Sequence, residues 1–99
     1  MPIYYPKQDF VDFYISKTPD KGGAYALYDM NEAIFFGWTR DSIRDELYKH
    51  KQGLYGPCTR AAVYFNHQPT LFPDYKYREL MREFEKANGR RPRCMVDKS

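Results

Sequence analysis

The chain has 99 residues, a formal net charge of +3 at pH 7, ten Tyr and seven Phe. This length gives one domain with a single modest core, and the charge is well below the strongly basic balance of a dedicated nucleic-acid binder. No stretch is long and apolar enough to span a membrane, and the N-terminus lacks the charged start and apolar core of a signal peptide. We therefore expect a cytoplasmic protein, with no membrane contact and with reduced thiols at Cys58 and Cys94.

The N-terminal segment, residues 1–22, is predicted to be an arm followed by a short helix. Residues 1–6 are bracketed by prolines and predicted to be extended, and residues 8–16 carry apolar side chains at mixed helical spacing. Residues 17–23 are rich in turn-forming types and lead into the next segment. We place the principal domain at residues 23–99, within one compact unit overall.

Residues 23–38 contain two short apolar runs separated by the polar tetrad Asp29-Met30-Asn31-Glu32. Tyr, Phe, Ile and Ala dominate both runs, and Gly and Asp or Asn bound them. This composition is typical of two strands joined by a tight turn. The sequence therefore predicts a β-hairpin on which the rest of the chain packs.

A helix is predicted to follow the hairpin. Thr39 or Asp41 can cap it, and it ends near Lys51 with Gly53 just beyond. Its apolar face carries three residues at helical spacing: Ile43, Leu47 and His50. We interpret His50 as a helix-end residue that interacts favourably with the helix dipole rather than as a metal ligand.

The second half of the chain is predicted to hold a third strand and a long helix. Residues 53–58 form a loop, and residues 60–65 form an apolar strand buried on both sides. The long helix is expected to run from Asp74, a good N-cap residue, to Asn88, where Gly89 follows. Its apolar stripe contains Tyr77, Leu80, Met81, Phe84 and Ala87. The basic tail at residues 90–95 is expected to add an edge strand.

Two triplets in the hairpin carry a family resemblance. Gly23-Ala24-Tyr25 opens the first strand and Phe35-Phe36-Gly37 closes the second, and the predicted element order is β-β-α-β-α. This arrangement resembles the GIY-YIG nuclease family. The entry to the first helix, residues 37–41, and the position of His50 near that helix's end also match the family pattern. The resemblance implies an α+β fold with a small three-stranded antiparallel sheet flanked by helices.

A second stretch of the resemblance implies a metal site. Residues 82–86 followed by Arg91-Pro92-Arg93 are similar to the segment in which the family places a metal-binding Glu upstream of a Pro-Arg pair, which carries this role to Glu83. The implied activity is hydrolysis of phosphodiester bonds with one divalent cation, Mg²⁺ or Mn²⁺, held by Glu83. A hard cation prefers carboxylate oxygen and stabilises charge that develops on phosphate oxygens. Tyr25 would position or deprotonate the attacking water.

The family also places an Arg in the first helix, where it neutralises the phosphate. That position holds Glu46 when the helix is matched by its His and Asp45 when it is matched by its Gly. Arg44 or Arg40 is the expected substitute, because adjacent helix residues differ by about 100° in direction. The second triplet also has Phe35 where the family commonly has Tyr.

Contacts with nucleic acid, DNA in the first instance, are assigned to four further residues. Trp38 can stack on a base, and Lys49, Arg90 and Arg91 can contact phosphates without reading sequence. A protein partner or a dimer is expected to supply specificity. Two alternatives stay open: a catalytically inactive GIY-YIG-like domain that binds nucleic acid or a protein, and an unrelated aromatic-rich α+β interaction domain.

Overall fold

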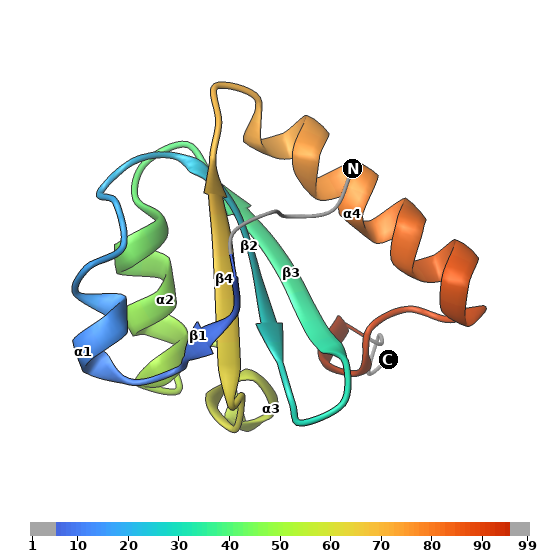
Figure 1. The fold of residues 1–99 in the computed structure, drawn as a ribbon, viewed down its shortest axis with the longest axis horizontal. Coiled ribbons are helices and arrows are strands. Elements are labelled where there is room, and N and C mark those ends of the chain that lie inside the picture. The colour runs from blue at the N-terminus through green and yellow to red at the C-terminus, as the bar shows by residue number, and fades with distance from the viewer. Residues whose placement is uncertain (1–5, 96–99) are drawn as a thin grey trace.

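The computed structural model describes residues 6–95. The fold is α+β, as predicted, but its antiparallel sheet has four strands rather than the predicted three, in the order β1-β4-β2-β3 (Figure 1). The strands are β1 (Gln8–Asp9), β2 (Gly23–Tyr28), β3 (Ala33–Thr39) and β4 (Tyr64–Pro69). The helices are α1 (Asp12–Ile15), α2 (Ile43–Lys51), α3 (Pro57–Arg60) and α4 (Pro73–Asn88), and a 3₁₀ turn, η1, spans Arg93–Met95.

Helices cover both faces of the sheet, with α1 and α2 on one side and α4 on the other (Figure 1). Side chains alternate along β2, so Tyr25 and Leu27 face α2 whereas Ala24 and Ala26 face α4. The core toward α1 and α2 contains Phe10, Ile15, Tyr25, Leu27, Ile34, Ile43, Leu47, Ala62 and Phe65. The core toward α4 contains Ala24, Ala26, Ala33, Phe36, Leu80, Met81 and Phe84. The small alanines let α4 approach the sheet closely.

The predicted hairpin is confirmed, because β2 and β3 pair antiparallel along their lengths. The turn between them is closed by Asp29, whose carboxylate accepts hydrogen bonds from the backbone N–H groups of Asn31 and Glu32, each at 2.8 Å. These two donors hold the pKa of the Asp29 carboxyl below its ordinary value. Arg93 adds an ion pair to the same carboxylate at 3.2 Å, which ties the C-terminal 3₁₀ turn to the hairpin.

The N-terminal prediction needs correction. Within the predicted helix at residues 8–16, Gln8 and Asp9 instead form β1, which pairs with β4, and only Asp12–Ile15 is helical. A two-residue polar strand carries no hydrophobic alternation, so the sequence could not show it. Phe10 and Ile15 lie in the core, so this part of the segment 1–22 belongs to the same folded unit. Most of the predicted extended arm lies outside the described residues.

Three element boundaries also differ from the predictions. The cap of α2 is Ser42, whose hydroxyl accepts from the Asp45 backbone N–H at 3.1 Å, rather than Thr39 or Asp41. The third predicted strand starts at Tyr64 rather than near residue 60, because α3 occupies Pro57–Arg60. Helix α4 begins at Pro73, so Asp74 lies in its first turn and is not the cap. The predicted stop at Gly89 is confirmed by its left-handed backbone, with φ of 69°.

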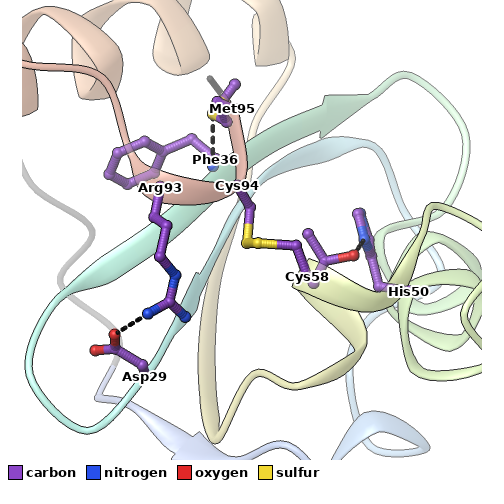
Figure 2. The surroundings of a disulfide bond; sticks show 8 residues. Asp29, Phe36, His50, Cys58, Arg93, Cys94 and Met95 are labelled. Carbon is purple, nitrogen blue, oxygen red and sulfur yellow. Dashed lines mark hydrogen bonds and ion pairs between the residues drawn. A yellow bond between two sulfur atoms is a disulfide. The ribbon is translucent and has the colours of Figure 1, made fainter. Parts of the chain in front are cut away.

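Cys58 and Cys94 form a disulfide, so the prediction of reduced thiols is wrong for this structure. Figure 2 shows the bond joining α3 to η1, with Cα atoms 5.6 Å apart. The cysteines are separated by 36 residues, and no local pattern reveals a contact over that distance. The end of the basic tail, Arg93–Met95, is therefore a 3₁₀ turn held by the disulfide rather than the predicted edge strand.

No helix in the described part of the chain has the length and apolarity needed to cross a membrane.

Candidate functional site

A pocket at the open edge of β3 gathers residues from both sides of the sheet. Its volume is about 350 Å³, at the small end of the range of about 300–1,000 Å³ for small-molecule sites. The lining residues are Tyr25, Phe35, Phe36, Gly37, Trp38, Glu46, His50, Tyr55, Tyr77 and Met95. We call this site the aromatic pocket, because most of its wall is aromatic rings. It includes residues of both hairpin triplets that carried the family resemblance.

The floor of the aromatic pocket is a buried chain of hydrogen bonds. The Tyr25 hydroxyl lies 2.8 Å from His50 Nε2, and His50 Nδ1 lies 2.8 Å from the Thr59 hydroxyl. All three side chains belong to residues that are at most 3% exposed. Burial lowers the pKa of His50 to about 4, against a smaller opposing effect of Glu46, so its ring is neutral at pH 7. A neutral imidazole donates through one nitrogen and accepts through the other, which satisfies both neighbours.

Tyr25 is poorly suited to act as a general base. Burial raises the pKa of its phenol well above the ordinary value, and the Glu46 carboxylate raises it further. The hydroxyl is also engaged by His50. The side chain therefore stays protonated near neutral pH and forms part of the pocket floor.

Gly37 is required by the packing of Tyr25. The two residues are directly paired across β2 and β3, and a Cβ atom at position 37 would overlap the end of the Tyr25 ring. The glycine at position 37, which is part of the family resemblance, is therefore explained by steric packing against Tyr25 in this fold.

We expect Gly37→Ala to lower the free energy of unfolding by about 2 kcal/mol, the usual scale for overpacking a tight core. The added methyl must push the Tyr25 ring away from His50, because its contacts there are with the ring and hydroxyl. Urea denaturation measures the loss. Gly37→Ala should cost less in a Tyr25→Phe background than in the wild type, and an equal cost in both backgrounds would contradict the overlap with the hydroxyl.

Glu46 supplies the negative charge of the aromatic pocket. One carboxylate oxygen accepts from the Tyr55 hydroxyl at 2.9 Å and the other from Lys49 Nζ at 3.1 Å. The sequence matched this position to the phosphate-binding Arg of the family by way of His50. The pocket thus presents a carboxylate where that comparison expects a cation. Lys49, a predicted phosphate contact, is already paired with Glu46.

The two substitute arginines lie elsewhere. Arg44 pairs with Asp20 at 3.1 Å, and Arg40 lies 3.7 Å from Asp74 with its guanidinium 5.3 Å from the Trp38 ring centroid. Neither is among the described residues that line the aromatic pocket. Trp38 does line it and is partly exposed, as its predicted role in stacking requires.

Glu83, the predicted metal ligand, is not among the described residues that line the aromatic pocket with Tyr25. It lies on α4, which packs on one face of the sheet, whereas Tyr25 faces α2 on the other. Within residues 6–95 no group of three or more His, Cys, Asp or Glu side chains is placed to hold a metal. The role of Glu83 as a ligand of Mg²⁺ or Mn²⁺ therefore stays a prediction.

A basic groove adjoins the aromatic pocket along α4. It has a volume of about 800 Å³ and is lined by Tyr77, Arg78, Met81, Arg82, Glu85, Lys86 and Arg91. Three cations recur every four residues, at positions 78, 82 and 86, and so lie in one row on the helix. Arg78 pairs with Asp74 at 3.2 Å, whereas Arg82, Lys86 and Arg91 make no ion pair with any other described residue.

Tyr77 lines both the basic groove and the aromatic pocket, so the two adjoin at this side chain. The sequence pointed to Arg91 as a nucleic-acid contact, and Arg91 does line the groove. Arg90 instead donates to both carboxylate oxygens of Glu32 at 2.7 Å. The apolar stripe predicted Tyr77 as a core residue, and Arg82 and Lys86 were not among the predicted contacts, although the four-residue spacing of the cations was a signal for this row. No protein-family model matches the chain, and no curated protein matches it by sequence.

Proposed function

We propose that this protein binds single-stranded nucleic acid without cleaving it, through the basic groove and the adjoining aromatic pocket. The observation that carries the proposal is the position of Tyr77, which joins a row of cations to a cluster of aromatic rings. Proteins that bind single strands combine a positive groove that follows the backbone with rings on which bases stack. A single strand laid along α4 would place its phosphates at the cations and a base at the pocket mouth.

The charges of the groove support contacts with phosphate. Arg82, Lys86 and Arg91 are exposed and carry no ion pair with another described residue, so they can meet phosphate oxygens without first breaking a contact. Glu85 lies among them and reduces the local positive charge. With a net charge of only +3, the binding should be weak and should fall steeply with salt.

Arg82→Ala and Lys86→Ala are expected to weaken binding to a fluorescein-labelled single-stranded DNA, each by about three- to tenfold at low salt. Each should also reduce the slope of log K against log salt by about 0.7, the value per phosphate contact on a single strand. Fluorescence anisotropy at several salt concentrations measures both quantities. A parallel titration with RNA of the same sequence compares the two nucleic acids.

Lys17→Ala is the matched control, because it removes one positive charge on the α1 side of the sheet, where Lys17 lies over the Phe13 ring. It should change binding by less than Lys86→Ala does. Equal effects of the two substitutions would show that only the net charge matters, and would count against the groove.

A metal-dependent nuclease of the GIY-YIG type is the second candidate. The observation in its favour is that one pocket collects Tyr25, Phe35, Gly37 and His50, the residues that carried the family resemblance. The wild-type chain is incubated with plasmid, single-stranded DNA and RNA in Mg²⁺ or Mn²⁺, beside Tyr25→Phe and Glu83→Ala. Our proposal expects no cutting, and metal-dependent nicking lost in both variants would establish the nuclease instead.

The disulfide bears on where the protein works. Structural disulfides persist in oxidising compartments and are rare in the cytosol, where thiol pools keep cysteines reduced. We therefore propose that the protein is cytoplasmic only if Cys58 and Cys94 are reduced in the cell. The thiol state of Cys58 and Cys94 in freshly lysed cells decides between the cytosol and an oxidising compartment.

A further inference from the structure

We infer that the aromatic pocket takes a single unstacked base that carries an exocyclic amino group, and that Glu46 accepts a hydrogen bond from that group. Cytosine is the base that we assign first. This inference rests on the proposed function, because it names the part of the nucleic acid that enters the pocket beside the basic groove. It goes further by giving the protein a preference among bases.

The walls of the pocket suit a flat ring. Trp38 and Tyr55 are 39% and 49% exposed, so part of each ring is accessible at the mouth, and Phe35 and Tyr77 line the pocket with them. Stacking of a base on an aromatic side chain contributes about 1–3 kcal/mol and tolerates any base. The rings therefore explain why a base would enter but do not select one.

Selection comes from the polar groups, and Glu46 is the acceptor that stays available. Tyr25 and His50 satisfy each other at the floor, and the Tyr55 hydroxyl already donates to Glu46. An ionised carboxylate has about four lone-pair sites and donates none, and here two of those sites are used by Tyr55 and Lys49. The remaining capacity matches an N–H donor, such as the N4 amino group of cytosine.

Uracil differs from cytosine by an oxygen where cytosine has that amino group. Its O4 would meet the Glu46 carboxylate, which has no proton to donate, so two acceptors would face each other. A site arranged to accept from a base amino group discriminates strongly against an analogue that lacks it. The pocket should therefore favour cytosine over uracil.

An alkylammonium ion is the competing occupant, because aromatic rings beside a carboxylate also attract such cations. The surroundings of the pocket argue against it. The groove that continues from Tyr77 carries Arg82, Lys86 and Arg91, which would repel a cationic peptide and attract a polyanion. A nucleotide strand satisfies both the pocket and the groove.

The chain contains one Trp, and it lines the pocket, so its fluorescence reports occupancy directly. Titration of the wild-type chain with cytidine monophosphate and uridine monophosphate, excited at the red edge of Trp38 absorption, should give about tenfold tighter binding of the cytidine compound. The same preference should appear in anisotropy with oligodeoxycytidine and oligodeoxyuridine of equal length. Equal affinities would overturn the inference, and so would tighter binding of tetramethylammonium.

Glu46→Gln tests the assigned acceptor, because an amide can accept from cytosine or donate to uracil. We expect it to reduce the preference from about tenfold to about twofold or less while both oligonucleotides still bind. Asp45→Asn is the control, since it removes the neighbouring charge of α2 outside the pocket lining, and it should keep the full preference. A full preference in Glu46→Gln would overturn the role of Glu46.

These results separate the inference from the proposed function. If both oligonucleotides bind with equal affinity and Lys86→Ala weakens the binding of each, the proposed function is retained and the base pocket is rejected. An absence of binding by every oligonucleotide would reject the proposed function, and the inference would fall with it. Thermal melting of each variant shows that its fold is intact before binding is compared.

Discussion

Reduction of the Cys58–Cys94 disulfide is expected to lower the free energy of unfolding by about 3 to 4 kcal/mol. The bond closes a loop across a sequence separation of 36 residues, and the loss of chain entropy in the unfolded state gives this magnitude. For a domain of 99 residues the melting temperature should fall by roughly 15–25 °C. A loss of this size is a large fraction of the total stability of a small domain.

The same bond also holds one wall of the aromatic pocket. Cys94 fixes η1, whose Met95 lines the pocket and accepts a hydrogen bond from the Phe36 backbone N–H through its sulfur at 3.3 Å (Figure 2). Reduction should therefore weaken the change in Trp38 fluorescence on nucleotide binding, in addition to lowering the stability. The two properties have a common cause in the release of the C-terminal turn.

Urea denaturation with and without a dithiol reductant measures the change in stability. Cys58→Ser/Cys94→Ser is the matched control. Its stability should equal that of the reduced wild type and should not change when the reductant is added. If oxidised and reduced wild-type protein unfold at the same urea concentration, the disulfide does not form in solution or does not constrain the chain.

Acidification from pH 7 to pH 5 is expected to destabilise the fold by about 2 kcal/mol through His50. Its pKa is about 4 in the folded state and about 6.5 in the unfolded state, so the unfolded chain binds more protons between these values. Stability is therefore fully present above about pH 6.5 and is lost as the pH falls toward 4. The complete loss approaches 3 kcal/mol, because burial opposes a charge on the ring.

His50→Gln provides the comparison for this prediction. The variant loses stability at pH 7, because Tyr25 and Thr59 lose their matched partner, but it should show a smaller decrease between pH 7 and pH 5. His67, whose pKa is also lowered by burial, adds to the effect in the same direction, so His67→Gln is measured beside it. An unchanged pH dependence in His50→Gln would show that the ring is not the group that titrates.

Short-range patterns determined a large part of this fold. Two short apolar runs around a polar tetrad identified the β2–β3 hairpin, and the 3.6-residue stripe with Gly89 at its end identified α4. These signals are readable because a strand or a helix places residues close in sequence on one face. For the same reason the sequence placed Tyr25 and Gly37 in neighbouring strands.

The candidate site depended on contacts that no local pattern contains. The family resemblance assigned Tyr25 and Glu83 to one catalytic site, but Tyr25 packs toward α2, whereas α4, which carries Glu83, packs on the other face of the sheet. The two-residue strand β1 and the Cys58–Cys94 bond both join segments distant in sequence. The path of the chain around the sheet brings Glu46, Tyr55 and Tyr77 to the open edge of β3. Residue types and periodicity therefore predicted the elements, whereas long-range packing set which side chains share a site.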